Sequence, residues 1–105
     1  MTAYEVLIEF EVHHARKRLP GSVRQQIRRL FDDLASNPRP SHSQAIDIAQ
    51  WEVPPGVEVR RLRLVPWRII YAVNDQEAWV WILAIRRRPP YNYEDLPDLI
   101  ARIQR

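Results

Sequence analysis

Three β-rich segments follow one another between Val57 and Ile85, and they constrain the fold of this chain more than any other feature. They cover residues 57–65, 67–73 and 78–85. Pro66 breaks the chain between the first two, and the Asn-Asp-Gln-Glu run at 74–77 supplies a hairpin turn between the last two. Connections this short join antiparallel strands. The last segment contains WVWILAI, which is apolar on both faces and therefore indicates a central strand.

Helical patterns lie on either side of these strands in the sequence. Residues 4–10 alternate apolar and acidic side chains, which predicts a first strand. Apolar residues then recur at helical spacing in three stretches, 12–19, 23–34 and 96–103. Ser22 and Gln25 are expected to form a capping box for the second helix, which should end at Asn37-Pro38. The expected fold is α+β, in the order β-α-α-β-β-β-α, with the two N-terminal helices packed on one side of an antiparallel sheet and a C-terminal helix.

The size and composition of the chain suit one small domain spanning 1–105. The chain has 105 residues, of which 46% are hydrophobic, enough for one core and too many for a disordered chain. It has no cysteine, and its first ten residues lack the basic start of a signal peptide. No run approaches the length of a membrane span. We therefore expect a cytoplasmic protein.

Arginine supplies nearly all of the positive charge. Lys17 is the one lysine among 16 basic residues, and the formal net charge is +3. A guanidinium group is a planar fork that matches phosphate and stacks on nucleobases. The bias towards arginine is equally compatible with a GC-rich genome, so composition alone leaves both explanations open.

The stretch VEVRRLRLVPWRIIY, residues 57–71, carries the most specific chemical pattern. Side chains alternate along a strand, so Arg61 and Arg63 share one face while Leu62 takes the other. Arg68 follows on the neighbouring strand. Cations on adjacent strands repel one another unless an anion lies between them, which favours an anion-binding face. The alternatives are a solvated charged face and, for Arg68, an ion pair within the fold.

A second basic cluster ends the last strand. Arg86, Arg87 and Arg88 come immediately before PPYNY, which contains Tyr91 and Tyr93. Paired guanidinium groups can hold a phosphate, and a tyrosine ring can stack on a base, so the pattern is compatible with RNA binding. A strand end is also a common place for solvated charge.

These stretches resemble the RelE/ParE toxin superfamily. RRLRLVPWRIIY is similar to that family's "YRLRVGDYRVIY" segment, ILAIRRRPPYNY resembles its closing strand with a basic cluster and tyrosine, and LFDDLASNP resembles the end of its second helix. The resemblance covers nearly the whole chain. It implies a toxin that a partner antitoxin neutralises. One branch of the family cleaves mRNA on the ribosome, and the other inhibits DNA gyrase.

The resemblance also assigns roles by position. In the nuclease branch, the residues matching Arg61, Arg63 and Arg68 hold and polarise the scissile phosphate. A further phosphate contact matches one of Arg86–Arg88 with a register ambiguous by one, and we assign it to Arg87. Tyr93, or else Tyr91, matches the tyrosine near the cleaved nucleotide. The expected additional RNA contacts are Arg60, Arg86, Arg88 and Tyr91.

Two departures from the family pattern affect the chemistry. Val65-Pro66 replaces the usual Gly-Asp turn, and arginine stands where the family's nuclease sites use lysine. Arginine does not give up its proton in proteins, so it cannot act as a general base. We expect His13, His14 and His42 to be surface or capping residues, and we expect no metal and no cofactor.

The sequence thus predicts an mRNA endonuclease toxin that acts on the ribosome and is held inactive by a cognate antitoxin. The alternatives are a gyrase inhibitor without nuclease activity and a former toxin that now serves as a binding module.

Overall fold

The strand run predicted from the sequence forms the middle of a five-stranded sheet. In the computed structural model, which describes residues 3–103, the strand order is β1-β5-β4-β3-β2. The central strands are β3 (Val57–Leu64), β4 (Trp67–Asn74) and β5 (Trp79–Arg87), which pair antiparallel as expected. The outer strand β1 (Glu5–Ile8) runs parallel to β5. Because β1 leads into a helix rather than a hairpin, no tight turn forces it to run antiparallel.

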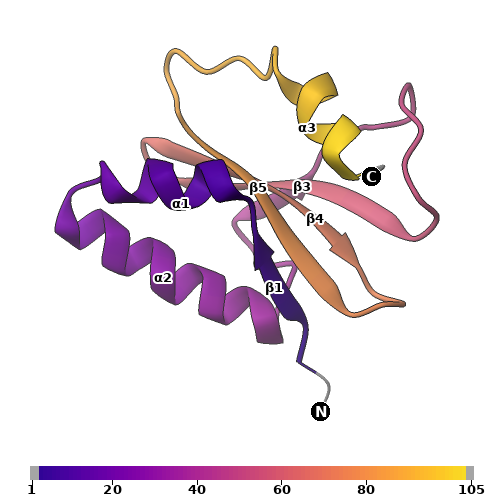
Figure 1. Ribbon diagram of the computed structural model, residues 1–105, viewed down its shortest axis with the longest axis horizontal. Coiled ribbons are helices and arrows are strands. Elements are labelled where there is room, and N and C mark those ends of the chain that lie inside the picture. Colours follow the sequence, from indigo (N-terminus) through magenta and orange to yellow (C-terminus); the bar gives the residue numbers. More distant parts are fainter. Residues whose placement is uncertain (1–2, 104–105) are drawn as a thin grey trace.

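Helices cover both faces of the sheet (Figure 1). The helices α1 (Phe10–Lys17) and α2 (Gly21–Ser36) pack on one face, as predicted, and α3 (Leu96–Ile103) packs on the opposite face. Each face has its own buried cluster. The cluster on the α1–α2 side is built around Leu62, Tyr71 and Ile82. The cluster on the α3 side is built around Val59, Ile70 and Ile100, and Trp51 packs against it.

The start of α2 differs from the prediction. The helix begins at Gly21, two residues earlier than a cap at Ser22 predicts, and no side chain caps it. Pro20 occupies the capping position with φ of −54° and ψ of 149°. Its ring holds φ near the helical value, so the chain enters the helix directly from the proline and the predicted capping box at Ser22 is wrong.

A short strand, β2 (Ser43–Ala45), lies between α2 and β3 and is absent from the element order that the sequence predicted. It pairs antiparallel with β3, with Ser43 opposite Leu62 and Gln44 opposite Arg61. Buried Ser43 donates its hydroxyl hydrogen to the Pro40 carbonyl at 2.7 Å. The three residues of β2 have little apolar character and give no strand signal in the sequence. The strand forms because it pairs with β3.

A bulge in β5 decides which way its last residues point. Ile70 pairs with Ala84 but Tyr71 pairs with Ile82, so Leu83 is one residue more than β4 can match. An extra residue shifts the alternation of side chains by one. Ile82 and Ile85 therefore both face α1–α2, whereas Leu83 and Ala84 both face α3.

None of the helices between residues 3 and 103 has the length and the apolar run that crossing a bilayer would require.

Replacing Leu62 with alanine is expected to destabilise the protein by about 2–5 kcal/mol, because the side chain is fully buried under α1 and α2. The neighbouring Arg63 points to the other face and is exposed, so Arg63→Ala should change the free energy of unfolding by less than about 0.5 kcal/mol. Urea denaturation of both variants measures this. A larger loss for Arg63→Ala than for Leu62→Ala would contradict the facing of β3.

Candidate functional site

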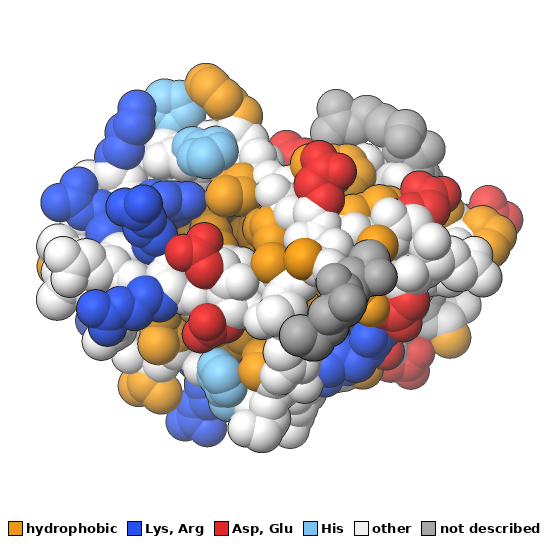
Figure 2. Space-filling view, turned by 90° about the horizontal axis from the view of Figure 1, so that it is seen from below, with side chains coloured by type: hydrophobic (Ala, Val, Ile, Leu, Met, Phe, Trp, Pro, Cys, Tyr) orange, Lys and Arg blue, Asp and Glu red, His pale blue; other side chains and the backbone are white. Residues whose placement is uncertain are grey.

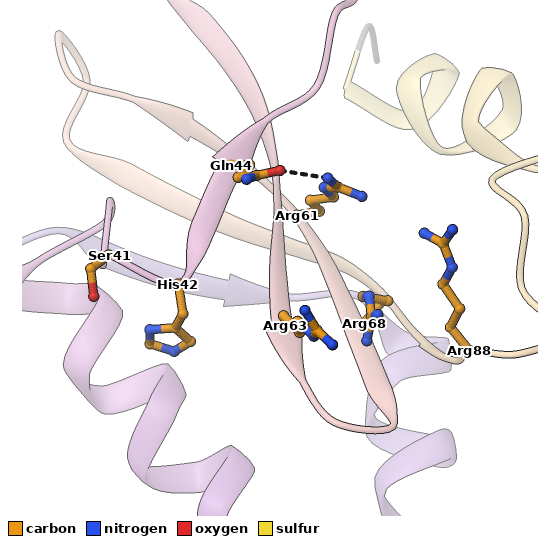
Figure 3. A pocket seen from close by; sticks show the side chains of 7 residues that line it. All are labelled: Ser41, His42, Gln44, Arg61, Arg63, Arg68 and Arg88. Atoms are coloured by element: carbon orange, nitrogen blue, oxygen red, sulfur yellow. Dashed lines mark hydrogen bonds between the residues drawn. The ribbon is translucent and has the colours of Figure 1, made fainter.

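A pocket of about 520 Å³ opens on the α3 side of the sheet, beside the β3–β4 hairpin (Figure 3). It is lined by Ser41, His42, Gln44, Arg61, Arg63, Arg68 and Arg88. Four of these seven side chains are guanidinium groups, and within residues 3–103 no carboxylate contributes to the lining. The pocket is therefore cationic and polar, and its ligand should be an anion.

Arg63 and Arg68 form a like-charged pair across two strands. They are directly opposite one another in the β3–β4 register, so their side chains leave the same face of the sheet. Arg68 donates to the backbone carbonyl of Trp67 at 3.0 Å. Among the ion pairs of the described chain, none involves Arg63 or Arg68. Directly opposed like charges are destabilising, and an anion bound between them would relieve the repulsion.

Arg61 is held by two neighbours. One guanidinium nitrogen donates to the side-chain oxygen of Gln44, which lies opposite Arg61 on β2, and another donates to the Tyr93 hydroxyl at 3.4 Å. The guanidinium carbon also lies 5.9 Å from the centre of the Tyr93 ring. These contacts fix the direction of Arg61 before any ligand arrives.

Tyr93 is held in an unusual backbone conformation beside the pocket. Its φ of 66° is in the left-handed region, which bulky side chains rarely adopt, and its carbonyl accepts the N–H of Leu96 at 3.2 Å as α3 begins. Its ring lies within cation–π distance of two guanidinium groups, at 5.9 Å from Arg61 and 5.6 Å from Arg88. Such strain is found preferentially at functional sites, so the geometry favours a functional role for this tyrosine.

A smaller apolar pocket adjoins the cationic one and shares Arg61 with it. It has a volume of about 190 Å³ and is also lined by Ala45, Ile46, Tyr93 and Leu96. A flat, partly apolar group attached to a phosphate would meet both environments at once. A nucleotide has this chemistry.

Tyr91 has a structural position instead. Its hydroxyl donates to Asp95 at 2.6 Å, and its ring packs 4.6 Å from the ring of Tyr93. Burial, reinforced by the hydrogen bond to Asp95, raises the pKa of the Tyr91 phenol well above its usual value. Tyr91 therefore stays protonated and supports Tyr93 from behind.

Three of the arginines predicted for the site lie elsewhere. Arg60 faces the α1–α2 side, where it contacts Ser43 and pairs with Glu58 at 2.9 Å. Arg87 also faces that side, with its guanidinium carbon 6.0 Å from the centre of the Trp67 ring. Arg60 faces α1–α2 because side chains alternate along β3. Arg87 faces the same side because the bulge at Leu83 shifts the alternation along β5 by one residue.

Arg86 faces the α3 side but is already neutralised. It pairs with Asp95 at 2.9 Å and with Glu11 at 3.4 Å, so it ties the segment before α3 to both β5 and α1. The pocket therefore receives Arg88, not Arg87, from the basic cluster.

The pocket also contains side chains that the sequence did not predict. His42 and Gln44 lie opposite Arg63 and Arg61 along the β2–β3 pair, and Ser41 precedes them. Their place depends on β2, which has no signal in the sequence. Knowledge that this segment pairs with β3 would have been needed to place these three side chains in the pocket.

Positive charge is not confined to this pocket. Lys and Arg side chains also gather at the end of the molecule where α1 meets α2 (Figure 2). There Arg16, Lys17, Arg24 and Arg28 line open hollows on the helix surface. What distinguishes the sheet pocket is the combination of opposed arginines, an oriented Arg61 and the strained Tyr93.

Metal-binding chemistry has no candidate in the part of the chain that the structure describes. Residues 3–103 contain no group of three or more His, Cys, Asp or Glu side chains placed to hold a metal ion.

Comparisons with known proteins agree with the fold described above. Residues 9–89 match the family model for the ParE toxin of the type II toxin–antitoxin system parDE. No curated protein sequence matches the chain. Among solved structures, RelE of the RelE–RelB complex from the archaeon Pyrococcus horikoshii OT3 superposes with a TM-score of 0.73 and 26% identity, covering 87% of this chain and all of that one.

Two bacterial structures show the same fold at lower identity. The toxin–antitoxin complex RelBE2 from Mycobacterium tuberculosis matches with a TM-score of 0.65 and 18% identity over 82% of this chain and 99% of that chain. The isolated E. coli RelE toxin matches with a TM-score of 0.59 and 17% identity, over 96% of this chain and 99% of that one.

The bulge at Leu83 predicts different effects for two adjacent arginines. Arg88→Ala should weaken binding of a short single-stranded DNA oligonucleotide, an anion that carries both phosphates and bases, whereas Arg87→Ala should not. The slope of log affinity against log salt should become shallower by about 0.7 for Arg88→Ala, which corresponds to one lost phosphate contact. Fluorescence anisotropy at several salt concentrations measures both quantities. The reverse order of effects would show that Arg87 is the pocket residue.

Proposed function

This chain belongs to the RelE/ParE superfamily of type II toxin–antitoxin toxins, and on that premise we propose that it is a ribosome-dependent mRNA endonuclease that stops translation. The observation that carries the proposal is the pocket in which Arg61, Arg63, Arg68 and Arg88 converge without a carboxylate from residues 3–103. Four cations around one cavity suit a phosphate that gains negative charge during a reaction.

The proposed reaction is attack of a ribose 2′-hydroxyl on the adjacent phosphate of the mRNA. Negative charge develops on the phosphate oxygens as the new P–O bond forms, and preorganised cationic donors stabilise it. Arg63 and Arg68 would hold the phosphate between them, because they are opposed across β3 and β4. Arg61 is already oriented by Gln44, so little reorganisation is needed at the moment of reaction.

Tyr93 would place the nucleotide next to the reacting phosphate. Its ring borders both the cationic pocket, through Arg61 and Arg88, and the apolar slot with Ile46 and Leu96. Stacking of a base on an aromatic ring contributes about 1–3 kcal/mol per base. The ribosome would supply the remaining alignment of the mRNA, since holding reactants in an attacking geometry lowers a barrier substantially.

A second candidate is inhibition of DNA gyrase without nuclease activity. It is favoured by the family model, whose description names the ParE toxin of parDE. The two branches share the same strand core, so the fold is compatible with either. The opposed Arg63 and Arg68 and the strained Tyr93 between two cations favour the nuclease, because together they suit a phosphate and the nucleotide attached to it.

Induction of the toxin in growing cells separates the two candidates. We expect translation to stop and new mRNA ends to appear within translated regions, while DNA supercoiling stays unchanged. The double variant Arg61→Ala/Arg63→Ala should produce no new ends, because two phosphate-holding groups are lost. Arg87→Ala is the matched control and should behave like the unmodified toxin, since it lies outside the pocket. Unchanged mRNA ends together with altered supercoiling would refute the nuclease proposal in favour of gyrase.

The proposed partner is a cognate antitoxin that covers the cationic pocket. The structure from Pyrococcus horikoshii is a RelE–RelB complex, and that from Mycobacterium tuberculosis is the toxin–antitoxin complex RelBE2. For this chain, an acidic segment that folds on binding would neutralise the pocket arginines and place apolar side chains on the sheet.

Charge complementarity gives this partnership a measurable signature. The association rate of the toxin with its antitoxin should fall steeply as salt is raised, and the dissociation rate should change much less. Arg61→Ala/Arg63→Ala should slow association more than Arg87→Ala does in stopped-flow experiments. Equal association rates for the two variants would exclude contact between the antitoxin and the pocket.

A further inference from the structure

The proposed nuclease reaction leaves one chemical requirement unmet, and the inference here rests on that proposed function. Attack by a 2′-hydroxyl needs a group that accepts its proton. The four arginines of the pocket cannot do so, because guanidinium stays protonated in proteins. The family resemblance places the phosphate-holding residues but offers no lysine here, since Lys17 is the only lysine of the chain and lies at the end of α1.

His42 is positioned beside Arg63 by strand pairing. Ser43 pairs with Leu62 in the β2–β3 register, so His42 comes next opposite Arg63. The Arg63 N–H donates to the His42 carbonyl at 3.3 Å, which extends the ladder by one residue beyond β2. Residues opposite one another in an antiparallel pair point to the same face, so the imidazole shares the face of Arg63.

The backbone next to His42 is held firmly in place. The hydroxyl of the buried Ser43 donates to the Pro40 carbonyl at 2.7 Å and accepts a hydrogen bond from Arg60 at 2.9 Å. This anchor lies on the α1–α2 side of the sheet, directly behind the pocket. His42 itself is exposed and lines the pocket, with no part in the buried core.

Figure 3 shows His42 on one wall of the pocket and Arg88 on the opposite wall, with Arg63 and Arg68 between them. The charged groups that face His42 are thus Arg61 and Arg63 from β3, Arg68 from β4 and Arg88 from the segment after β5. The other lining residues, Ser41 and Gln44, are neutral. Within residues 3–103 no lining carboxylate is available to compete for a proton, and an imidazole is the side chain that ordinarily changes protonation between about pH 5 and 8.

We propose that His42 is the general base of the cleavage reaction. An unprotonated ring nitrogen of His42 takes the proton of the 2′-hydroxyl as the 2′-oxygen bonds to phosphorus. The bond between phosphorus and the 5′-oxygen breaks, and the leaving 5′-oxygen takes a proton from water. The products are a 2′,3′-cyclic phosphate and a free 5′-hydroxyl, and the imidazolium then returns its proton to solvent.

The test is single-turnover cleavage of a defined mRNA on purified ribosomes with saturating toxin, between about pH 5.5 and 8. His42→Gln keeps a polar side chain that cannot take up a proton. We expect it to lower the cleavage rate by about 10²–10⁴-fold, the usual contribution of a general base, and to remove the rise of the rate with pH. The toxin concentration that gives half-saturation should stay unchanged.

His14→Gln is the matched control. His14 is also exposed, but it lies on α1 with its ring 4.5 Å from that of Phe10, outside the pocket. It should keep both the rate and the pH profile of the unmodified toxin. In a His42→Ala variant, added imidazole should restore part of the rate, whereas His14→Ala should not respond.

The outcomes separate this inference from the proposed function. If the unmodified toxin cuts and His42→Gln cuts equally fast, or keeps the same dependence on pH, then His42 is not the base although the nuclease stands. If His42→Gln only raises the half-saturating concentration, His42 binds RNA and the inference is again overturned. If the unmodified toxin cuts nothing on programmed ribosomes, the proposed function and the inference both fall.

Discussion

The pairing of β4 with β5, and the one surplus residue within it, determines which face of the sheet each residue at the end of β5 takes, and so which arginine of the basic cluster enters the pocket. Leu83 is accommodated as a bulge between Ala84, opposite Ile70, and Ile82, opposite Tyr71. A register change of one residue exchanges the two faces of a strand. The interior is unaffected because both faces are covered, one by α1–α2 and the other by α3, so apolar side chains find a core on either side. At the basic end of β5 the two faces are not equivalent, because the pocket lies on one face only. The bulge therefore decides which arginine reaches the pocket.

The arginines of the molecule divide into those with carboxylate partners and those without. Arg39 bridges Glu58 and Asp75, and Arg86 and Arg102 share Glu11 between them. These pairs join segments far apart in the sequence, including α1 and α3. Because they are partly exposed, each contributes modestly to stability, and their main effect is to fix how α3 and the segment before it lie on the sheet. The pocket arginines have no such partner among the described residues, so their charge is available to a ligand.

The site is assembled from four separate parts of the chain, each fixed by a different interaction. Ser43 anchors the segment that carries His42, strand pairing opposes Arg63 to Arg68, and the bulge directs Arg88. Tyr93 is fixed by the start of α3 behind it. This arrangement keeps the strain of Tyr93 and the repulsion among the arginines in the folded state. The two buried clusters supply the stability that offsets both.

The sequence by itself determined the order of the main elements, the two-sided burial of β5 and the common face of Arg61 and Arg63. These follow from the periods of strands and helices, which are local properties. The tertiary structure alone decided the presence of β2 and the choice of Arg88 over Arg87. It also placed His42 in the pocket. Each of these depends on a partner distant in the sequence: β3 creates β2, and β4 forces the bulge in β5. A pairing register is a relation between two strands, and neither strand contains it alone.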